Sequence, residues 1–288
     1  MEKRKKGQEN PDMEEKSFKC GGFNEKVCLM RKRWREISDY RELLGNLVVT
    51  ELRLRYRDSI LGFLWTVLNP LFFLVILALV FSRIIKIQME NYTIFLFSGM
   101  VSYLMIQQTV LIATGSIVNN QGLIKKVNVP KILFPLSNVL ARYVDHLILT
   151  LILLLFMAYF GMSFTWNLLA LVPLLLLHFF FSLGASLLAS VFYVWVRDVQ
   201  HILSIGLQAF FYITPVIYPL DILPPSLHKI FLLNPFYYFV QSFRYPVYFG
   251  QFPPLKMWGI AFLLTVVFLA LGLGIFFRKE RFFVFQLS

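Results

Sequence analysis

The feature that most constrains this chain is a series of long stretches without a single charged side chain. A helix needs roughly 20 apolar residues to cross about 30 Å of hydrocarbon, because each residue advances the helix by about 1.5 Å. The stretches cover residues 59–82, 91–124, 146–196 and 199–220. Every stretch is long enough for one crossing, and the third, residues 146–196, is long enough for two.

The composition places these stretches in a membrane. Of the 288 residues, 58% are hydrophobic and 15% are charged, which is more apolar surface than a soluble domain buries in one core. We therefore predict an all-α, polytopic membrane protein with six transmembrane helices. The predicted spans are residues 60–81, 93–117, 136–160, 168–195, 202–218 and 257–277.

The basic residues indicate orientation. A net charge of +12 would suit nucleic acid, but Lys and Arg lie in the tail, the loops and the span ends, so no nucleic-acid partner is expected. Placing both termini in the cytoplasm puts eleven basic residues inside and five outside, as the positive-inside rule requires. The inner set is Arg41, Arg53, Arg55, Arg57, Lys125, Lys126, Lys131, Arg197, Arg278, Lys279 and Arg281, and the outer set is Arg83, Lys86, Lys229, Arg244 and Lys256.

The N-terminal region divides into a polar tail and an amphipathic segment. Residues 1–35 hold too few aliphatic side chains to offset the entropy of ordering, which predicts a disordered cytoplasmic tail. The tail contains both cysteines, Cys20 and Cys28, which imply no disulfide framework and no complete metal site. Residues 36–58 predict an amphipathic helix in the cytoplasmic interface, with a helix packed on a soluble domain as the alternative. The apolar stripe consists of Tyr40, Leu43, Leu44, Leu47, Val48 and Leu52.

The connection between the last two predicted spans is the least regular part of the chain. Residues 218–256 contain seven prolines, and their apolar pieces, residues 230–233 and 236–240, are too short to cross a membrane. We predict short re-entrant or interfacial helices on the outer face. The permease domain then covers residues 59–281, with residues 218–256 as its outer gate region, and residues 282–288 form a cytoplasmic C-terminal tail.

Several kinds of catalytic site are missing from the sequence. It contains no GxxxxGK[ST] phosphate loop, no Gly-rich dinucleotide turn and no HExxH pair. The four histidines, His146, His178, His201 and His228, are scattered singly, and no acidic pair has a spacing suited to acid–base catalysis. We therefore expect no enzyme activity, no metal and no cofactor in this chain. If the chain belongs to a pump, the energy must come from a partner that binds the nucleotide.

Five short runs together carry a resemblance to a known family. TELRLRYRDSILGFLWTVLNPL (residues 50–71) resembles the beginning of the type-two ABC exporter permeases for bacterial surface polysaccharides. The other runs follow in the family's order, and the resemblance covers about residues 35–281. They are GLIKKVNVPKILFPL (122–136), WVRDV (195–199), TPVIYPLDILPP (214–225) and LLNPFYYFV (232–240).

The resemblance implies an assembly and a substrate. It implies a homodimer in the bacterial cytoplasmic (inner) membrane, with each copy docked on a cytoplasmic subunit that binds ATP and Mg. The exported molecule would be a lipid-linked polysaccharide such as O antigen, capsule or teichoic acid. Two alternatives stay open at this point: a permease for a small lipophilic drug or lipid, and, from another class, a membrane scaffold or lipid-modifying enzyme.

Charged cytoplasmic segments are the candidates for coupling to the ATPase subunit. Around Val129 and Pro130, a rigid step in a basic loop favours a shaped contact over simple positive-inside anchoring. At Arg197 and Asp198, helix capping or a salt bridge explains the residues equally well. The predicted coupling residues are Arg53, Arg55, Tyr56, Arg57, Lys125, Lys126, Asn128, Pro130, Lys131, Arg197 and Asp198.

Aromatic side chains are the candidates for a sugar path, because flat rings suit the C–H faces of sugars. The alternative for each residue is the ordinary aromatic belt or the core of the bundle. The predicted path residues are Trp65, Phe72, Phe73, Tyr103, Phe210, Phe211, Tyr212 and Tyr218. The predicted outer gate, for which interfacial anchoring is the alternative, consists of Asp221, Pro224, Pro225, Phe236, Tyr237 and Tyr238.

Two further patterns lie inside predicted spans. Arg142 and Asp145 are three residues apart and predict an ion pair, because an unpaired charge in the membrane is costly. A role in sensing the phosphate of the lipid carrier is the alternative. Small residues around Gly184 predict a site where two helices pack closely.

Overall fold

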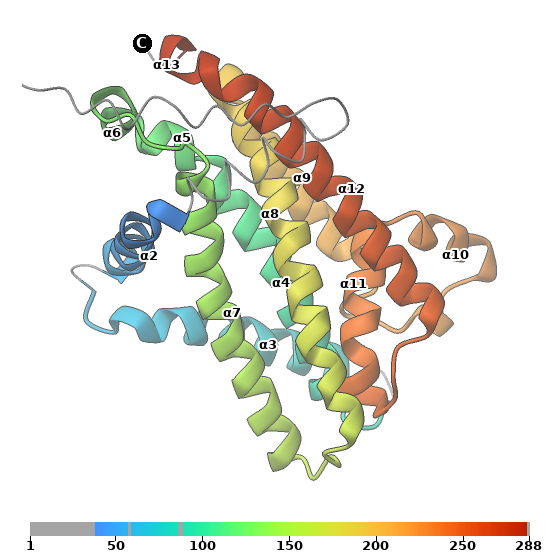
Figure 1. Ribbon diagram of the computed structural model, residues 1–288. Coiled ribbons are helices and arrows are strands. Elements are labelled where there is room, and N and C mark those ends of the chain that lie inside the picture. The colour runs from blue at the N-terminus through green and yellow to red at the C-terminus, as the bar shows by residue number, and fades with distance from the viewer. Residues whose placement is uncertain (1–37, 57–58, 86–88, 287–288) are drawn as a thin grey trace, which may run out of the picture. The chain divides into compact units, whose positions relative to one another are not determined.

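The structure is a computed structural model that describes residues 38–56, 59–85 and 89–286 (Figure 1). The chain divides into a unit of residues 1–42 and a unit of residues 43–288. Of the first unit, the structure describes residues 38–42. The predicted tail of residues 1–35 and both cysteines lie outside the described residues. The described part is helical and contains no strand, which confirms the all-α prediction.

Five helices are long and apolar enough to cross a membrane within the described residues. They correspond to predicted spans one to four and six. They are α3 with the short helices η3 and η4 (Gly62–Ile84), α4 (Tyr92–Thr114), α7 (Leu133–Tyr159), α8 with η5 (Trp166–Trp195) and α12 with η8 (Leu255–Phe282).

The predicted fifth span is shorter than the others. Helix α9 (Val199–Ile213) has 15 residues, which is about 22 Å at 1.5 Å per residue and less than the hydrocarbon layer. It ends because Pro215 follows it closely, and Tyr218 therefore lies in a loop and not in a helix. The predicted fifth span, and with it the count of six, stays a prediction, and α9 provides a shorter apolar helix in its place.

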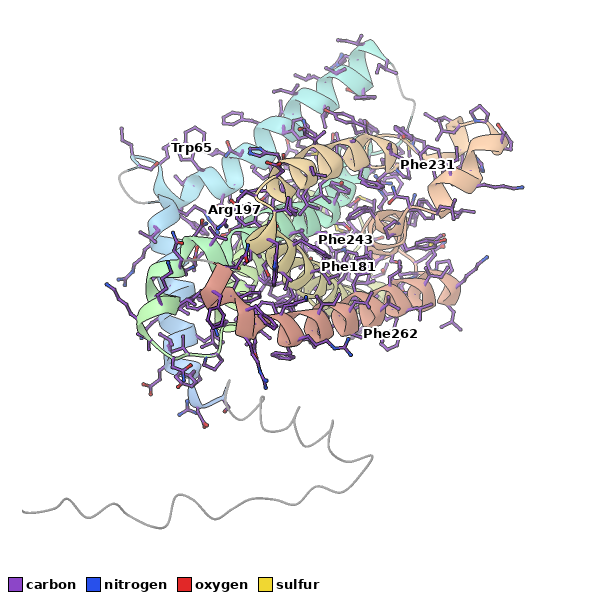
Figure 2. The ribbon with its side chains drawn as sticks, turned by 90° about the horizontal axis from the view of Figure 1, so that it is seen from above. Trp65, Phe181, Arg197, Phe231, Phe243 and Phe262 are labelled. Atoms are coloured by element: carbon purple, nitrogen blue, oxygen red, sulfur yellow. The ribbon has the colours of Figure 1, made fainter. Side chains whose placement is uncertain are left out.

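Helix α4 forms the centre of the bundle, and α3 lies at its edge. In the apolar 18-residue stretch of each span, 78% of the residues are buried in α4 and 17% are buried in the span that contains α3. Helix α4 packs against α7, α8 and α11, whereas α3 buries only Pro70 and Leu74 and crosses α7 at a steep angle (Figure 1). Figure 2 shows Phe181 and Phe243 inside the bundle and Trp65 and Phe262 at its periphery.

Helices α8 and α12 touch backbone to backbone at Gly184 and Gly272. A Cβ atom on Gly184 would lie 2.5 Å from the backbone nitrogen of Leu269, and one on Gly272 would lie 3.0 Å from the carbonyl carbon of Gly184. No side chain fits at either position. The close packing predicted from the small residues is confirmed at Gly184.

Short helices fill the irregular outer segment. They are η6 (Leu220–Ile222), α10 (Pro225–Leu232), α11 (Pro235–Arg244) and the π-helix η7 (Tyr245–Phe249). Proline begins both α10 and α11, where its missing N–H costs nothing, and the Asn234 side chain accepts a hydrogen bond from the Phe236 N–H at 3.0 Å. Helix α11 packs against α4 and α12, so part of this segment belongs to the core of the bundle.

The remaining helices lie at the opposite end. Helices α5 (Ser116–Asn119) and α6 (Gln121–Lys126) connect α4 to α7, and α13 (Phe283–Gln286) follows α12. Phe283, in the predicted C-terminal tail, is buried against Phe276 and Trp195. Phe283 therefore attaches that tail to the bundle, whereas Phe282 and Phe285 are exposed.

The predicted interface segment forms α2 (Arg41–Tyr56). The stripe residues Leu43, Leu44, Leu47, Val48 and Leu52 are half-buried, and so are Glu51 and Arg55, which share their face. This face is therefore less apolar than the stripe alone suggested. Its two charged residues, Glu51 and Arg55, both contact side chains of α7.

Candidate functional site

Two arginines share one carboxylate oxygen between α2 and α7. Arg142 Nη1 lies 3.2 Å from Asp145 Oδ2, and Arg55 Nη1 donates to the same oxygen from α2. Asp145 is buried, so its charge is tolerable only with such partners. The structure thus brings the two predicted ion-pair residues together and adds Arg55, which the sequence had assigned to ATPase coupling.

A second polar contact sets the register of α2 along α7. The Asn138 side-chain amide donates to Glu51 Oε1 at 3.1 Å. Glu51 precedes Arg55 by one helical turn, and Asn138 precedes Asp145 by two turns. Two contacts at separate heights fix both the position and the rotation of α2 against α7.

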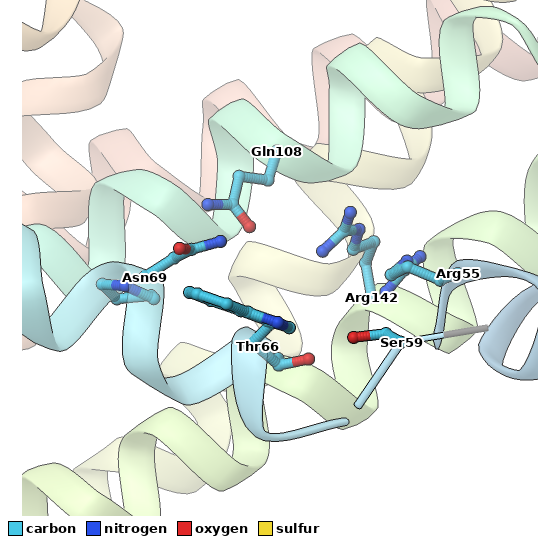
Figure 3. Close-up of a pocket in the computed structure, with 8 residues that line it drawn as sticks. Arg55, Ser59, Thr66, Asn69, Gln108 and Arg142 are labelled. Atoms are coloured by element: carbon cyan, nitrogen blue, oxygen red, sulfur yellow. The ribbon is translucent and has the colours of Figure 1, made fainter. Parts of the chain in front are cut away.

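Beside this cluster lies a polar cavity of about 390 Å³. Figure 3 shows the side chains of Asn69 and Gln108 pointing towards one another, with Arg142 and Arg55 side by side across the cavity. Guanidinium, amide, hydroxyl and indole groups all supply hydrogen-bond donors to this space. The lining residues are Arg55, Ser59, Trp65, Thr66, Asn69, Pro70, Gln108 and Arg142.

A second cavity, of about 590 Å³, is lined by apolar side chains, glycine and proline alone. It lies among α4, α8, α9, α11 and α12, and Phe210 and Phe236 both contribute to its wall. Such a surface suits a hydrocarbon chain and offers nothing to a sugar hydroxyl or a charged group.

The predicted path aromatics form a chain of ring contacts inside the protein. Tyr103 lies 5.3 Å from both Phe211 and Phe236, measured between ring centroids, and Phe73 lies 5.8 Å from Phe211. Tyr103 is completely buried, and its hydroxyl donates to the Leu207 carbonyl. It therefore packs α4 against α9 in this structure and lines no open path.

The other predicted path residues are more accessible. Phe72, Phe210, Tyr212 and Trp65 are exposed, and the Tyr218 hydroxyl donates to the Tyr212 carbonyl at 2.8 Å. Among these exposed residues, Trp65 lines the polar cavity and Phe210 the apolar one.

The six predicted gate residues do not form one surface. Asp221, Pro224 and Pro225 are exposed, whereas Phe236 and Tyr237 are buried in α11. Tyr238 is half-buried and donates its hydroxyl proton to the Leu232 carbonyl at 2.8 Å.

The predicted coupling residues have mixed surroundings. Lys125, Lys126 and Asn128 are exposed between the buried side chains of Ile124 and Val129, and Pro130 and Lys131 are half-buried. Buried residues on both sides of an exposed basic segment give it a fixed position. Of the remaining predicted residues, Arg53, Arg197 and Asp198 are exposed. Only the backbone of Tyr56 is described, and Arg57 lies outside the described residues.

Arg244 had been counted among the outer basic residues, and the structure adds that it is not a surface charge. Its side chain is completely buried in α11 and donates to the carbonyls of Pro215 at 2.5 Å, Phe95 at 3.3 Å and Val216. The guanidinium carbon lies 3.7 Å from the centre of the Phe95 ring. A Cβ atom on Gly99 would collide with this guanidinium, so glycine is required there.

No three His, Cys, Asp or Glu side chains gather in a metal-binding arrangement within residues 38–56, 59–85 and 89–286. His178 is held by Ser102 Oγ at 2.8 Å and the Leu174 carbonyl oxygen at 2.7 Å. Both ring nitrogens of His178 are therefore hydrogen-bonded within the core.

Residues 42–248 match the sequence profile of the ABC-2 type transporter family. This chain belongs to that family. The resemblance predicted from the sequence is thereby confirmed. The match begins in α2 and ends in η7, so it contains every residue that lines the polar cavity.

Several relatives are similar over most of their length. The chain is 33% identical over 252 residues to the O-antigen export system permease protein RfbA of Myxococcus xanthus, covering 86% of this chain and 96% of that protein. It is 30% identical over 208 residues to RfbA of Klebsiella pneumoniae, covering 70% and 79%. It is 28% identical over 246 residues to the polysialic acid transport protein KpsM of Escherichia coli, covering 82% and 92%. An ABC-2 protein of this kind is a membrane-embedded transport subunit.

Proposed function

We propose that this chain is the permease subunit of an ATP-driven exporter that moves lipid-linked polysaccharide across the bacterial cytoplasmic membrane. The observation that carries the proposal is the match to RfbA and KpsM proteins, whose names specify O-antigen export and polysialic acid transport. The alternative of a drug or lipid permease lacks such support.

The energy comes from a separate subunit that binds ATP and Mg, because the sequence has no phosphate loop of its own. The exposed segment of Lys125, Lys126 and Asn128 is the proposed contact for that subunit. Force applied there reaches α7 directly, because Val129 and Ile132 are buried and α7 begins at Leu133. Helix α7 in turn holds α2 through Asp145 and Asn138.

Two copies form the transporter, with both termini in the cytoplasm. Helix α3 supports this arrangement, because it exposes an apolar face that includes Phe72, Ile76 and Leu79. Helix α9 exposes Ile202 and Ile205 in the same manner. These loosely packed helices suit a boundary between two copies, where a polymer would pass.

Export by intact cells tests the proposal. We expect that deleting the gene for this chain removes the long surface polysaccharide and leaves its lipid-linked precursor inside the cell. Expression of this chain together with its ATPase subunit restores export, and an ATPase subunit unable to hydrolyse ATP does not. Normal surface polysaccharide in the deletion strain would overturn the proposal. Loss of drug efflux with intact polysaccharide export would favour the drug permease.

A further inference from the structure

The polar cavity carries an inference that rests on the proposed function and extends it to a binding site. We propose that the cavity lined by Arg55, Arg142, Asn69 and Gln108 binds the phosphate-bearing headgroup of the lipid-linked substrate. The headgroup chemistry is a phosphate or diphosphate ester at the junction of a hydrocarbon chain and a sugar.

The depth of the cavity fits such a headgroup. Arg142 lies nine residues after α7 begins at Leu133, and Gln108 lies six residues before α4 ends at Thr114. At 1.5 Å per residue these positions are about 13 Å and about 9 Å from the helix ends. Polar headgroup layers occupy the outer part of a bilayer about 40–45 Å thick around a hydrocarbon core of about 30 Å. With the helix ends taken as the membrane surface, the cavity lies just below the headgroup layer, at the edge of the hydrocarbon core.

The donors in the cavity fit phosphate oxygens. Arginine binds phosphate through parallel N–H groups, and Asp145 holds the guanidinium groups of Arg55 and Arg142 beside one another. The amides of Asn69 and Gln108 point towards one another on the opposite side (Figure 3), and neither has a hydrogen-bond partner among the described residues. Donors thus approach the same space from α2, α3, α4 and α7.

The cavity also has room and a suitable wall for the sugar next to the phosphate. Its volume of about 390 Å³ exceeds that of a phosphate group. Trp65 lines it from the beginning of α3, and an indole ring offers a flat apolar face together with one N–H donor. Because the cavity is open, a hydrocarbon chain attached to the phosphate can remain in the membrane.

Direct binding tests the assignment. The probe is a radiolabelled polyprenyl diphosphate, added to the permease with its ATPase subunit in nanodiscs of phosphatidylcholine. We expect saturable binding that the corresponding polyprenol does not displace, and that phosphatidylglycerol displaces only at concentrations at least tenfold higher than unlabelled polyprenyl diphosphate. Equal displacement by the polyprenol would overturn recognition of the phosphate. Equal displacement by phosphatidylglycerol would show a general anionic-lipid site and overturn the assignment to the substrate.

Neutral substitutions locate the site. Gln108→Leu and Asn69→Leu remove amides without disturbing the Asp145 ion pairs, and each should weaken binding about tenfold, the effect of a lost hydrogen bond to a charged group. Gln107→Leu is the matched control, because Gln107 is equally half-buried but does not line the cavity. Binding by both test variants equal to that of the control would overturn the proposal.

Export by the same complex, reconstituted in proteoliposomes, separates this inference from the proposed function. If the unmodified complex moves no polysaccharide with ATP, the proposed function is wrong. If it does so, and Gln108→Leu and Asn69→Leu leave the half-saturating substrate concentration unchanged, only the cavity assignment is wrong. The expected result is a rise in that concentration with little change in the maximal rate.

Discussion

The protein contains two buried arginine sites that differ in what surrounds the charge. Arg244 is enclosed completely and is bound by three backbone carbonyls and an aromatic ring, and no carboxylate of the described residues is hydrogen-bonded to it. Arg55 and Arg142 are bound by a carboxylate and line an open polar cavity. The first arrangement holds helices together, and the second leaves donors beside a space that a ligand can enter.

The largest expected effect is at Arg244. Arg244→Leu removes the donors to the Phe95, Pro215 and Val216 carbonyls and should lower the free energy of unfolding by about 4 kcal/mol. Thermal unfolding of the purified protein in detergent, followed by size-exclusion fluorescence, measures this change.

Gly99 offers an independent test of the same contact from α4. Gly99→Ala should also destabilise strongly, because its Cβ would lie only 3.1 Å from the Val216 carbonyl oxygen and overlap the guanidinium. Gly274→Ala is the control, because the added methyl group would have no atom within 4 Å apart from its chain neighbours and the backbone of its own helix. Equal melting temperatures for the two alanine variants would contradict the structural role of Arg244.

The next effect in size is at the inner site. Asp145→Asn leaves Arg55 and Arg142 without their carboxylate and should cost about 3 kcal/mol of stability, the range seen when a buried ion pair loses one partner. Thermal unfolding again provides the measurement. If the variant is as stable as the original chain, Asp145 does not hold the two arginines.

A smaller effect on stability but a large one on activity is expected at the basic loop. The double change Pro130→Ala and Lys131→Ala should lower export about tenfold and leave membrane insertion intact, because both residues are only half-buried. ATP hydrolysis and export are measured together in proteoliposomes, and hydrolysis should continue without export. Unchanged export would exclude this loop as the coupling contact.

The smallest effect is expected at the wall of the polar cavity. Trp65→Ala should slow export of long polymers about threefold through lost ring contacts with sugar. Trp166→Ala is the control, because Trp166 is 84% exposed and lines neither cavity, whereas Trp65 is 41% exposed. A similar rate for both variants would remove Trp65 from the path.

The sequence predicted the helices of spanning length because hydropathy is a local property of the chain. Long-range contacts could not be predicted in the same way. Arg55 and Asp145 are 90 residues apart, and no local spacing indicates that they meet. Arg142 and Asp145 were predictable because both lie on one helix face.

Two residues are more deeply buried than the sequence indicated, for a common physical reason. Arg244 was counted among the outer basic residues because the sequence alone does not show its burial, yet a glycine opposite and three backbone carbonyls accommodate its side chain. Tyr103 was assigned to a path because sequence alone does not say which side of a fully apolar helix faces its neighbours. Both residues lie on helices that are buried nearly all round.

The glycine contact between α8 and α12 limits how the subunit can change shape. Because the backbones touch at Gly184 and Gly272, any sliding of one helix along the other would bring main-chain atoms into collision. These two helices must therefore travel as one body during a transport cycle. Relative displacement is left to thinly packed helices such as α3, of which only Pro70 and Leu74 are buried, and α9, of which only Leu207 and Phe211 are buried.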